Sequence, residues 1–173
     1  PMPVYDHPGD GQAFAAQVAA GDVPWVELIS GKAGMLLPTA VAAEIADPGE
    51  LMAFWDRVMD ESADLAGFDR ARARAERFVF DRQISAGWMH SGYPVMGHLP
   101  TAVEVSDLAA LTTVGAWGPF HELGWVQVHG ALDADLAVIT LPIDDLRRPL
   151  SRLAMMPYLA ASNPPTFALE EVA

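Results

Sequence analysis

The chain contains no cysteine, so disulfide bonds, thiolate metal sites and cysteine nucleophiles are all excluded. It also lacks any apolar run of about 18 residues free of charge and proline, which is the length that a membrane-spanning helix needs. No basic segment followed by an apolar one opens the chain, so no signal peptide is visible. We therefore expect neither a membrane span nor a leader in these residues.

Basic residues are scarce. Ten lysines and arginines stand against 23 acidic residues, which gives a net charge of −13. Such a chain repels nucleic acid and anionic membrane surfaces, so neither is an expected partner. The charge has two interpretations, an acidic surface that aids solubility or a cleft that prefers cationic or neutral substrates. The one basic cluster, at residues 70–77, is interpreted as a solvated connection because no aromatic residue interleaves it.

The length of 173 residues fits one domain with a sizeable core. Because Pro1 rather than Met opens the chain, we expect a fragment or a processed piece. Residue spacing and helix-capping signals predict an α+β fold. The small mixed sheet would use strands within 24–37 and 77–96, and the helices expected to pack against it lie at 48–65 and 118–129. A shorter helix is predicted over 11–20.

Residues 121–125 read His-Glu-Leu-Gly-Trp, which differs in one letter from the zinc-peptidase pattern His-Glu-x-x-His. On a helix, two histidines four residues apart share one face and bind one zinc ion, and the glutamate activates the zinc-bound water. Here Trp125 stands at the second position, and an indole carries only an N–H donor. His129 is no substitute, because eight helical residues separate it from His121 by roughly 12 Å.

The flanking segments extend this pattern. Residues 90–94 read His-Ser-Gly-Tyr-Pro, and residues 117–124 read Trp-Gly-Pro-Phe-His-Glu-Leu-Gly. Further matches lie at residues 23–28, 48–56 and 76–87. In this order, the segments resemble the M60 family of enhancin-like zinc peptidases over about residues 20–124.

The resemblance implies a zincin-like (gluzincin) catalytic subdomain, with a small mixed β-sheet, packed helices and an incomplete C-terminal helical lobe. The corresponding division of the chain is a helical lead-in over 1–22, the catalytic subdomain over 23–130 and a divergent tail over 131–173. The family hydrolyses peptide bonds in proteins and glycoproteins, notably O-glycosylated, mucin-like chains, and is usually extracellular or at the cell surface.

The same resemblance assigns roles to four residues. His121 would be a zinc ligand and Glu122 the catalytic acid and base. Tyr93 and Trp117 would contact the substrate. Zinc is thus the implied cofactor.

The resemblance ends at Gly124, before the second ligand. The family's third ligand is a glutamate from a later helix, yet no glutamate lies between Glu122 and Glu170. We therefore expect weak or absent zinc and no hydrolysis by this chain. The alternative function is a non-catalytic homologue that binds glycans or proteins. A third reading, an unrelated acidic domain with a chance His-Glu pair, would place His121 outside any helix.

Four tryptophans are interpreted as core residues rather than sugar platforms: Trp25, Trp55, Trp88 and Trp117. His90 and His98 are expected to be structural or solvent-facing. On one continuous strand they would lie about 26 Å apart and could not share a metal ion, unless the chain turned between them.

Overall fold

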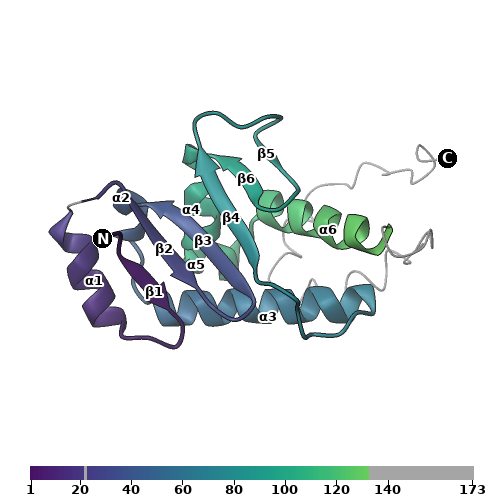
Figure 1. The fold of residues 1–173 in the computed structure, drawn as a ribbon, viewed down its shortest axis with the longest axis horizontal. Helices are drawn as coiled ribbons and strands as arrows, with labels where there is room; N and C mark the ends of the chain where they lie inside the picture. Colours follow the sequence, from purple (N-terminus) through teal and green to yellow (C-terminus); the bar gives the residue numbers. More distant parts are fainter. Residues whose placement is uncertain (22, 133–173) are drawn as a thin grey trace.

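The computed structural model describes residues 1–21 and 23–132, and for residues 125–132 the course of the helix. Within them a six-stranded mixed sheet packs against helices, which confirms the α+β prediction (Figure 1). The strands are β1 (Val4–Asp6), β2 (Trp25–Ile29), β3 (Ala33–Pro38), β4 (Glu76–Asp81), β5 (Met89–His90) and β6 (Val95–His98). The α-helices are α1 (Gly11–Ala20), α2 (Thr39–Ala42), α3 (Pro48–Ala66), α4 (Ala102–Ser106), α5 (Leu108–Thr113) and α6 (Trp117–Leu132), and a 3-10 turn, Leu99–Thr101, precedes α4. No helix among the described residues has the length and apolarity that a membrane crossing requires.

Capping side chains set the starts of α1 and α3. The Asp10 carboxylate accepts hydrogen bonds from the backbone N–H groups of the first turn of α1, and Asp47 does the same for α3. Pro48 occupies the first turn of α3, where its missing N–H costs nothing. Both helices end at glycines in the left-handed conformation, Gly21 and Gly67. The predicted helices over 11–20 and 48–65 are therefore confirmed.

The strand order across the sheet is β1-β2-β3-β4-β6-β5. Neighbours pair in parallel at β1/β2, β3/β4 and β4/β6, and antiparallel at β2/β3 and β5/β6. The edge strand β1, which sequence patterns did not predict, comes from the segment assigned to the lead-in. Three residues are too few for an alternation of apolar and polar positions to be recognised.

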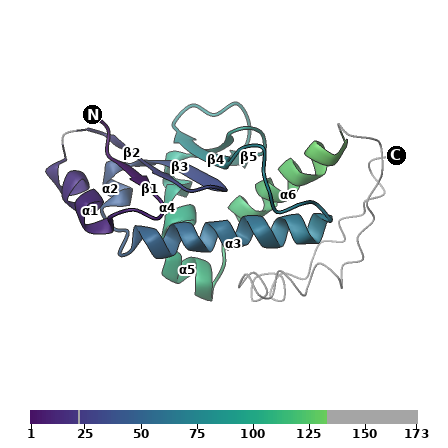
Figure 2. The same cartoon turned by 60° about the horizontal axis from the view of Figure 1, so that its bottom comes forward.

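The core lies between the sheet and α3, which runs beneath the strands in Figure 2. One stripe of α3 is buried, as its helical spacing predicts. Trp55 is fully buried in the middle of that stripe, and its ring centroid lies 5.0 Å from that of Phe78 on β4. The core prediction for Trp55 is therefore confirmed.

The prediction for Trp88 and Trp117 is wrong, because their side chains are 60% and 40% exposed. Trp88 directly precedes the short edge strand β5, and Trp117 opens α6. The segment 88–98 is also a hairpin rather than one strand, with Gly92 at a φ of 144° between β5 and β6. The backbone N–H of His98 donates to the carbonyl of Trp88, so this turn brings the two ends of the segment together.

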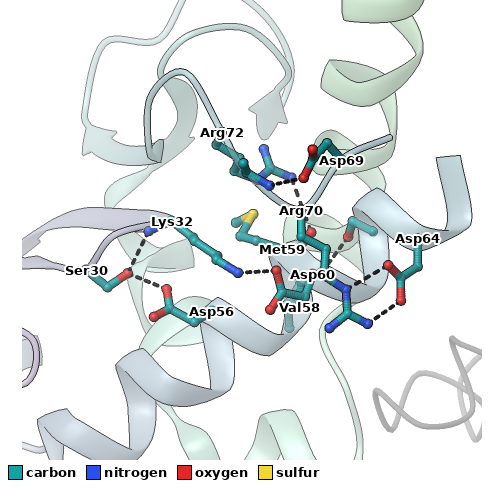
Figure 3. A network of polar contacts seen from close by, with 12 residues as sticks. Ser30, Lys32, Asp56, Val58, Met59, Asp60, Asp64, Asp69, Arg70 and Arg72 are labelled. Carbon is teal, nitrogen blue, oxygen red and sulfur yellow. Dashed lines mark hydrogen bonds and ion pairs between the residues drawn. The ribbon is translucent and has the colours of Figure 1, made fainter. Parts of the chain in front are cut away.

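The basic cluster at 70–77 is only partly a solvated connection. Arg72 is nearly buried and donates to Glu76 at 3.2 Å and to the Met59 carbonyl at 3.3 Å. Arg77 pairs with Glu27 on β2, and Lys32 pairs with Asp60 on α3. Figure 3 shows Lys32 beside Asp60 and Arg70 beside Asp64, two acidic side chains of α3. The solvated interpretation failed for Arg72 because tertiary packing supplies a buried partner that local sequence does not reveal.

Candidate functional site

Helix α6 positions His121 and Glu122. Phe120 and Leu123, which flank this pair in sequence, are buried against the body of the domain. The Phe120 ring stacks on Trp55, with centroids 5.7 Å apart. Because successive helical residues point about 100° apart, burial of these two leaves His121 and Glu122 half-buried at the edge of the interface. The predicted helix is confirmed, and an unrelated domain with His121 outside a helix is excluded.

His121 and Glu122 line a cleft of about 680 Å³, which lies between α6, the α4–α5 region and strand β5. Apolar side chains such as Met89 and Leu111 form part of its wall, and the exposed indoles of Trp88 and Trp117 also line it. Three carboxylates share the cleft with them: Glu104, Asp107 and Glu122. The cleft therefore combines aromatic surface with negative charge.

The imidazole of His121 is stacked on the indole of Trp117, one helical turn earlier. The two ring centroids are 4.2 Å apart and the planes differ by 19°. Trp117 thus covers a face of the ring that the sequence assigns to zinc. Residue 125, one turn later on the same helix, is the second tryptophan of this row.

The residues present do not fit a zinc site of the family's kind. Zinc requires imidazole, thiolate or carboxylate donors, and position 125 offers only an indole N–H. Among residues 1–21 and 23–124, whose side chains the structure describes, no three His, Asp or Glu side chains are grouped so that they could hold a metal ion. The acidic residues of the tail and the expected helical lobe lie outside the described residues.

Glu104 on α4 is a cleft residue that sequence reasoning missed. Its side chain is half-buried, and this burial raises the pKa of its carboxyl group above the usual value. A Cβ placed on Gly118 of α6 would lie 3.0 Å from Glu104 Oε2, so the carboxylate reaches the first turn of α6. No local motif marks Glu104, because only the packing of α4 beside α6 brings it into the cleft.

Tyr93 is not among the residues that line this cleft. Tyr93 is 46% exposed, and the guanidinium of Arg74 lies over its ring, with Cζ 3.4 Å from the ring centroid. The structure therefore brings Trp117, His121 and Glu122 together and leaves Tyr93 on a neighbouring surface. Its substrate role stays a prediction.

His90, beside that surface, has local partners. Its Nδ1–H donates to the Ser91 carbonyl at 3.1 Å, which leaves Nε2 to accept from the Ser85 hydroxyl at 3.0 Å.

Relatives of this chain are known. It is 46% identical over 104 residues to a TRPM8 channel-associated factor homolog of Xenopus laevis, a match that covers 60% of this chain and 12% of that protein. It is 42% identical over 116 residues to TRPM8 channel-associated factor 2 of Bos taurus, covering 67% and 13% of the two chains. The chain thus matches only about an eighth of the length of these curated relatives.

Solved structures share its fold. A functionally unknown conserved protein from Bacillus anthracis superposes with a TM-score of 0.63 at 21% identity, over 73% of this chain and 29% of the other. The ZmpB metallopeptidase of Clostridium perfringens gives 0.60 at 16% identity, over 71% and 28%. The M60 catalytic domain of ZmpC, from the same organism and in complex with the sialyl T antigen, gives 0.56 at 15% identity, over 71% and 28%.

The family described as peptidase M60, enhancin and enhancin-like matches residues 2–132, which is most of the chain. The described helices and mixed sheet agree with the M60 catalytic domains in architecture. The chain therefore belongs to the peptidase M60, enhancin and enhancin-like family.

Proposed function

We propose that this chain is a non-hydrolytic M60 domain that binds a segment of a protein or glycoprotein in the cleft beside α6. The observation that carries the proposal is position 125 on α6, one turn after His121. Trp125 stands there, where the zinc-peptidase pattern has its second histidine. Glu122 keeps the position of a catalytic base, but one imidazole does not replace the three protein ligands of a catalytic zinc site.

Binding is supported by what the cleft retains. Trp88 and Trp117 present exposed aromatic surface, which is favourable for contact with both sugar rings and polypeptide side chains. The ZmpC catalytic domain was solved with a glycan antigen, and the curated relatives are named for association with a channel protein. A glycoprotein ligand at the cell surface or outside the cell agrees with both, and it is part of this proposal.

Zinc content and cleavage test the loss of hydrolysis. After dialysis, elemental analysis of the 173-residue chain is expected to find far less than one zinc per protein. An O-glycosylated mucin peptide is expected to stay intact by mass spectrometry while it binds in a calorimetric titration. Stoichiometric zinc, or cleavage that a chelator abolishes, would overturn the proposal.

Substitution of position 125 sharpens this test. Trp125→His adds an imidazole one turn after His121, so its affinity for zinc should exceed that of the original chain. Trp125→Phe is the matched control, because it alters the aromatic side chain without adding a donor. Equal zinc affinity of the His and Phe variants would show that position 125 is not what limits metal binding.

A further inference from the structure

The described lining of the cleft is unbalanced in charge. Glu104, Asp107 and Glu122 contribute carboxyl groups, whereas no lysine or arginine lies among the lining residues that the structure describes. Asp107 already has a hydrogen-bond partner within the fold. Its carboxylate accepts a hydrogen bond from the backbone N–H of Ala110 at 2.9 Å and caps α5. A negatively charged ligand would meet uncompensated repulsion in such a cleft.

Glu104 and Glu122 are the carboxylates of this group that receive no hydrogen bond or ion pair from the described residues, and Glu104 is the one whose burial raises its pKa. Removal of a carboxylate from water without a partner is unfavourable, and an arriving cation would restore the lost interaction. Glu104 therefore favours a ligand that carries a positive charge.

The side chains around Glu104 indicate what the rest of that ligand is made of. Trp88 and Trp117 offer exposed indole faces, which attract a cation and also cover an aliphatic stem. Met89 and Leu111 add an apolar wall. An ion with no apolar part would leave this surface uncovered, whereas lysine and arginine side chains combine an apolar stem with a cationic head.

We propose that the cleft receives a lysine or arginine side chain of an extended protein segment, with its cationic head at Glu104 and its stem against the indole of Trp117. This rests on the proposed function in one respect, that the cleft is a binding site. It adds the class of residue that the site selects. A neutral glycan would depend on the indoles but not on the charge of Glu104.

Peptides that differ in a single charge test the proposal. Fluorescein-labelled Gly-Ala-Lys-Ala-Gly is titrated with the full chain, alongside the same peptide carrying acetyl-lysine or norleucine. The lysine peptide is expected to bind about tenfold more tightly, since a charge-assisted hydrogen bond contributes that much, and to lose affinity as salt is added. Equal affinity for the three peptides, or no binding of the lysine peptide at its solubility limit, would overturn the proposal.

Two variants assign the preference to Glu104. Glu104→Gln keeps the shape of the side chain and is expected to bind the lysine and acetyl-lysine peptides equally. Glu44→Gln is the matched control, because it removes the same charge at an exposed position outside this cleft and should keep the preference. A preference that survives in Glu104→Gln would also overturn the proposal.

Gly118→Ala tests the placement of the cation at Glu104 by displacing the Glu104 side chain. The added Cβ would lie 3.0 Å from Glu104 Oε2 and should displace the end of this flexible side chain without unfolding the helix. We expect a folded protein, by circular dichroism, with a reduced lysine preference. An unchanged preference in a folded Gly118→Ala variant would contradict the placement of the cation at Glu104.

These results are independent of the zinc test. A chain that holds zinc and cleaves peptides would refute the non-hydrolytic function yet still show or lack the lysine preference. A chain without zinc that binds all three peptides equally would refute the lysine or arginine site alone.

Discussion

The indole Nε1 of Trp55 donates a buried hydrogen bond of 2.8 Å to the backbone carbonyl of Val105. This bond joins the central helix α3 to α4, fifty residues later in the chain. Val105 follows Glu104, so the same bond fixes the backbone beside the cleft carboxylate. Trp55 also supports Phe120 of α6, and it therefore supports two sides of the cleft at once.

Trp55→Phe should lower the stability of the domain markedly. The substitution removes buried volume and strands the Val105 carbonyl without its donor, so the expected loss in unfolding free energy is about 2–4 kcal/mol. Urea denaturation followed by circular dichroism measures it. A loss no larger than that of a surface substitution would contradict the part assigned to this bond.

Removal of the Arg72 charge should lower the free energy of unfolding of the domain. Arg72→Met leaves the Glu76 carboxylate buried without its cation, with an expected loss of about 3–5 kcal/mol in denaturant unfolding. The exposed pair of Arg70 and Asp64 provides the control, and Arg70→Met should have no measurable effect.

A double variant separates the stranded charge from lost packing. Arg72→Met with Glu76→Leu removes both charged groups, so it should regain much of the stability lost in Arg72→Met. This pair is incompletely satisfied, since Arg72 Nε and Glu76 Oε2 find no hydrogen-bond partner among the described residues, which favours such a replacement. Additive losses in the double variant would show that packing dominates.

Glu104→Gln should change how stability depends on pH. Burial raises the pKa of Glu104 in the folded state above its unfolded value of about 4.3. The folded state therefore favours the protonated form, and this contribution is complete below the unfolded pKa and lost as pH rises through the folded pKa. Relative to the variant, the original chain should lose stability with rising pH across that window and show no further relative change above it.

Unfolding curves of both proteins, measured at a series of pH values, test this difference. Glu44→Gln again serves as the control, because it removes the same charge at an exposed position. Parallel curves for the original chain and Glu104→Gln over the whole range would contradict the burial of this carboxyl group.

Gly97→Ala should destabilise the sheet at β6. A Cβ at this position would lie 2.6 Å from the Thr101 hydroxyl and 3.0 Å from the Phe80 ring, and the expected cost is about 1–3 kcal/mol. Gly31→Ala is the matched control, because nothing lies within 4 Å of the added atom. Thermal unfolding of the two variants should separate them, and similar melting temperatures would refute the close approach.

Sequence patterns predicted the elements whose signals are local. Asp47, Pro48 and the apolar stripe of α3 define a helix without reference to any other part of the chain. The helix that carries His121 and Glu122 was predicted in the same way. These signals were sufficient for the fold class and for the helix at the centre of the candidate site.

Features that depend on distant contacts were missed or misjudged. Trp55 lies in the apolar stripe of α3, whereas the exposure of Trp88 and Trp117 depends on what packs against them in the folded chain. The burial of Glu104 and of Arg72 likewise comes from packing against other elements. A single sequence does not encode those neighbours in any local pattern.

The anchoring of α6 through Phe120 and Leu123 has an evolutionary consequence. Both anchors precede Trp125, where the zinc-peptidase pattern lacks its second histidine, and they pack α6 against the core that contains Trp55. The fold can therefore be kept while the zinc chemistry is lost. A substitution at position 125 can therefore remove a metal ligand without removing the contacts that hold α6 against the domain.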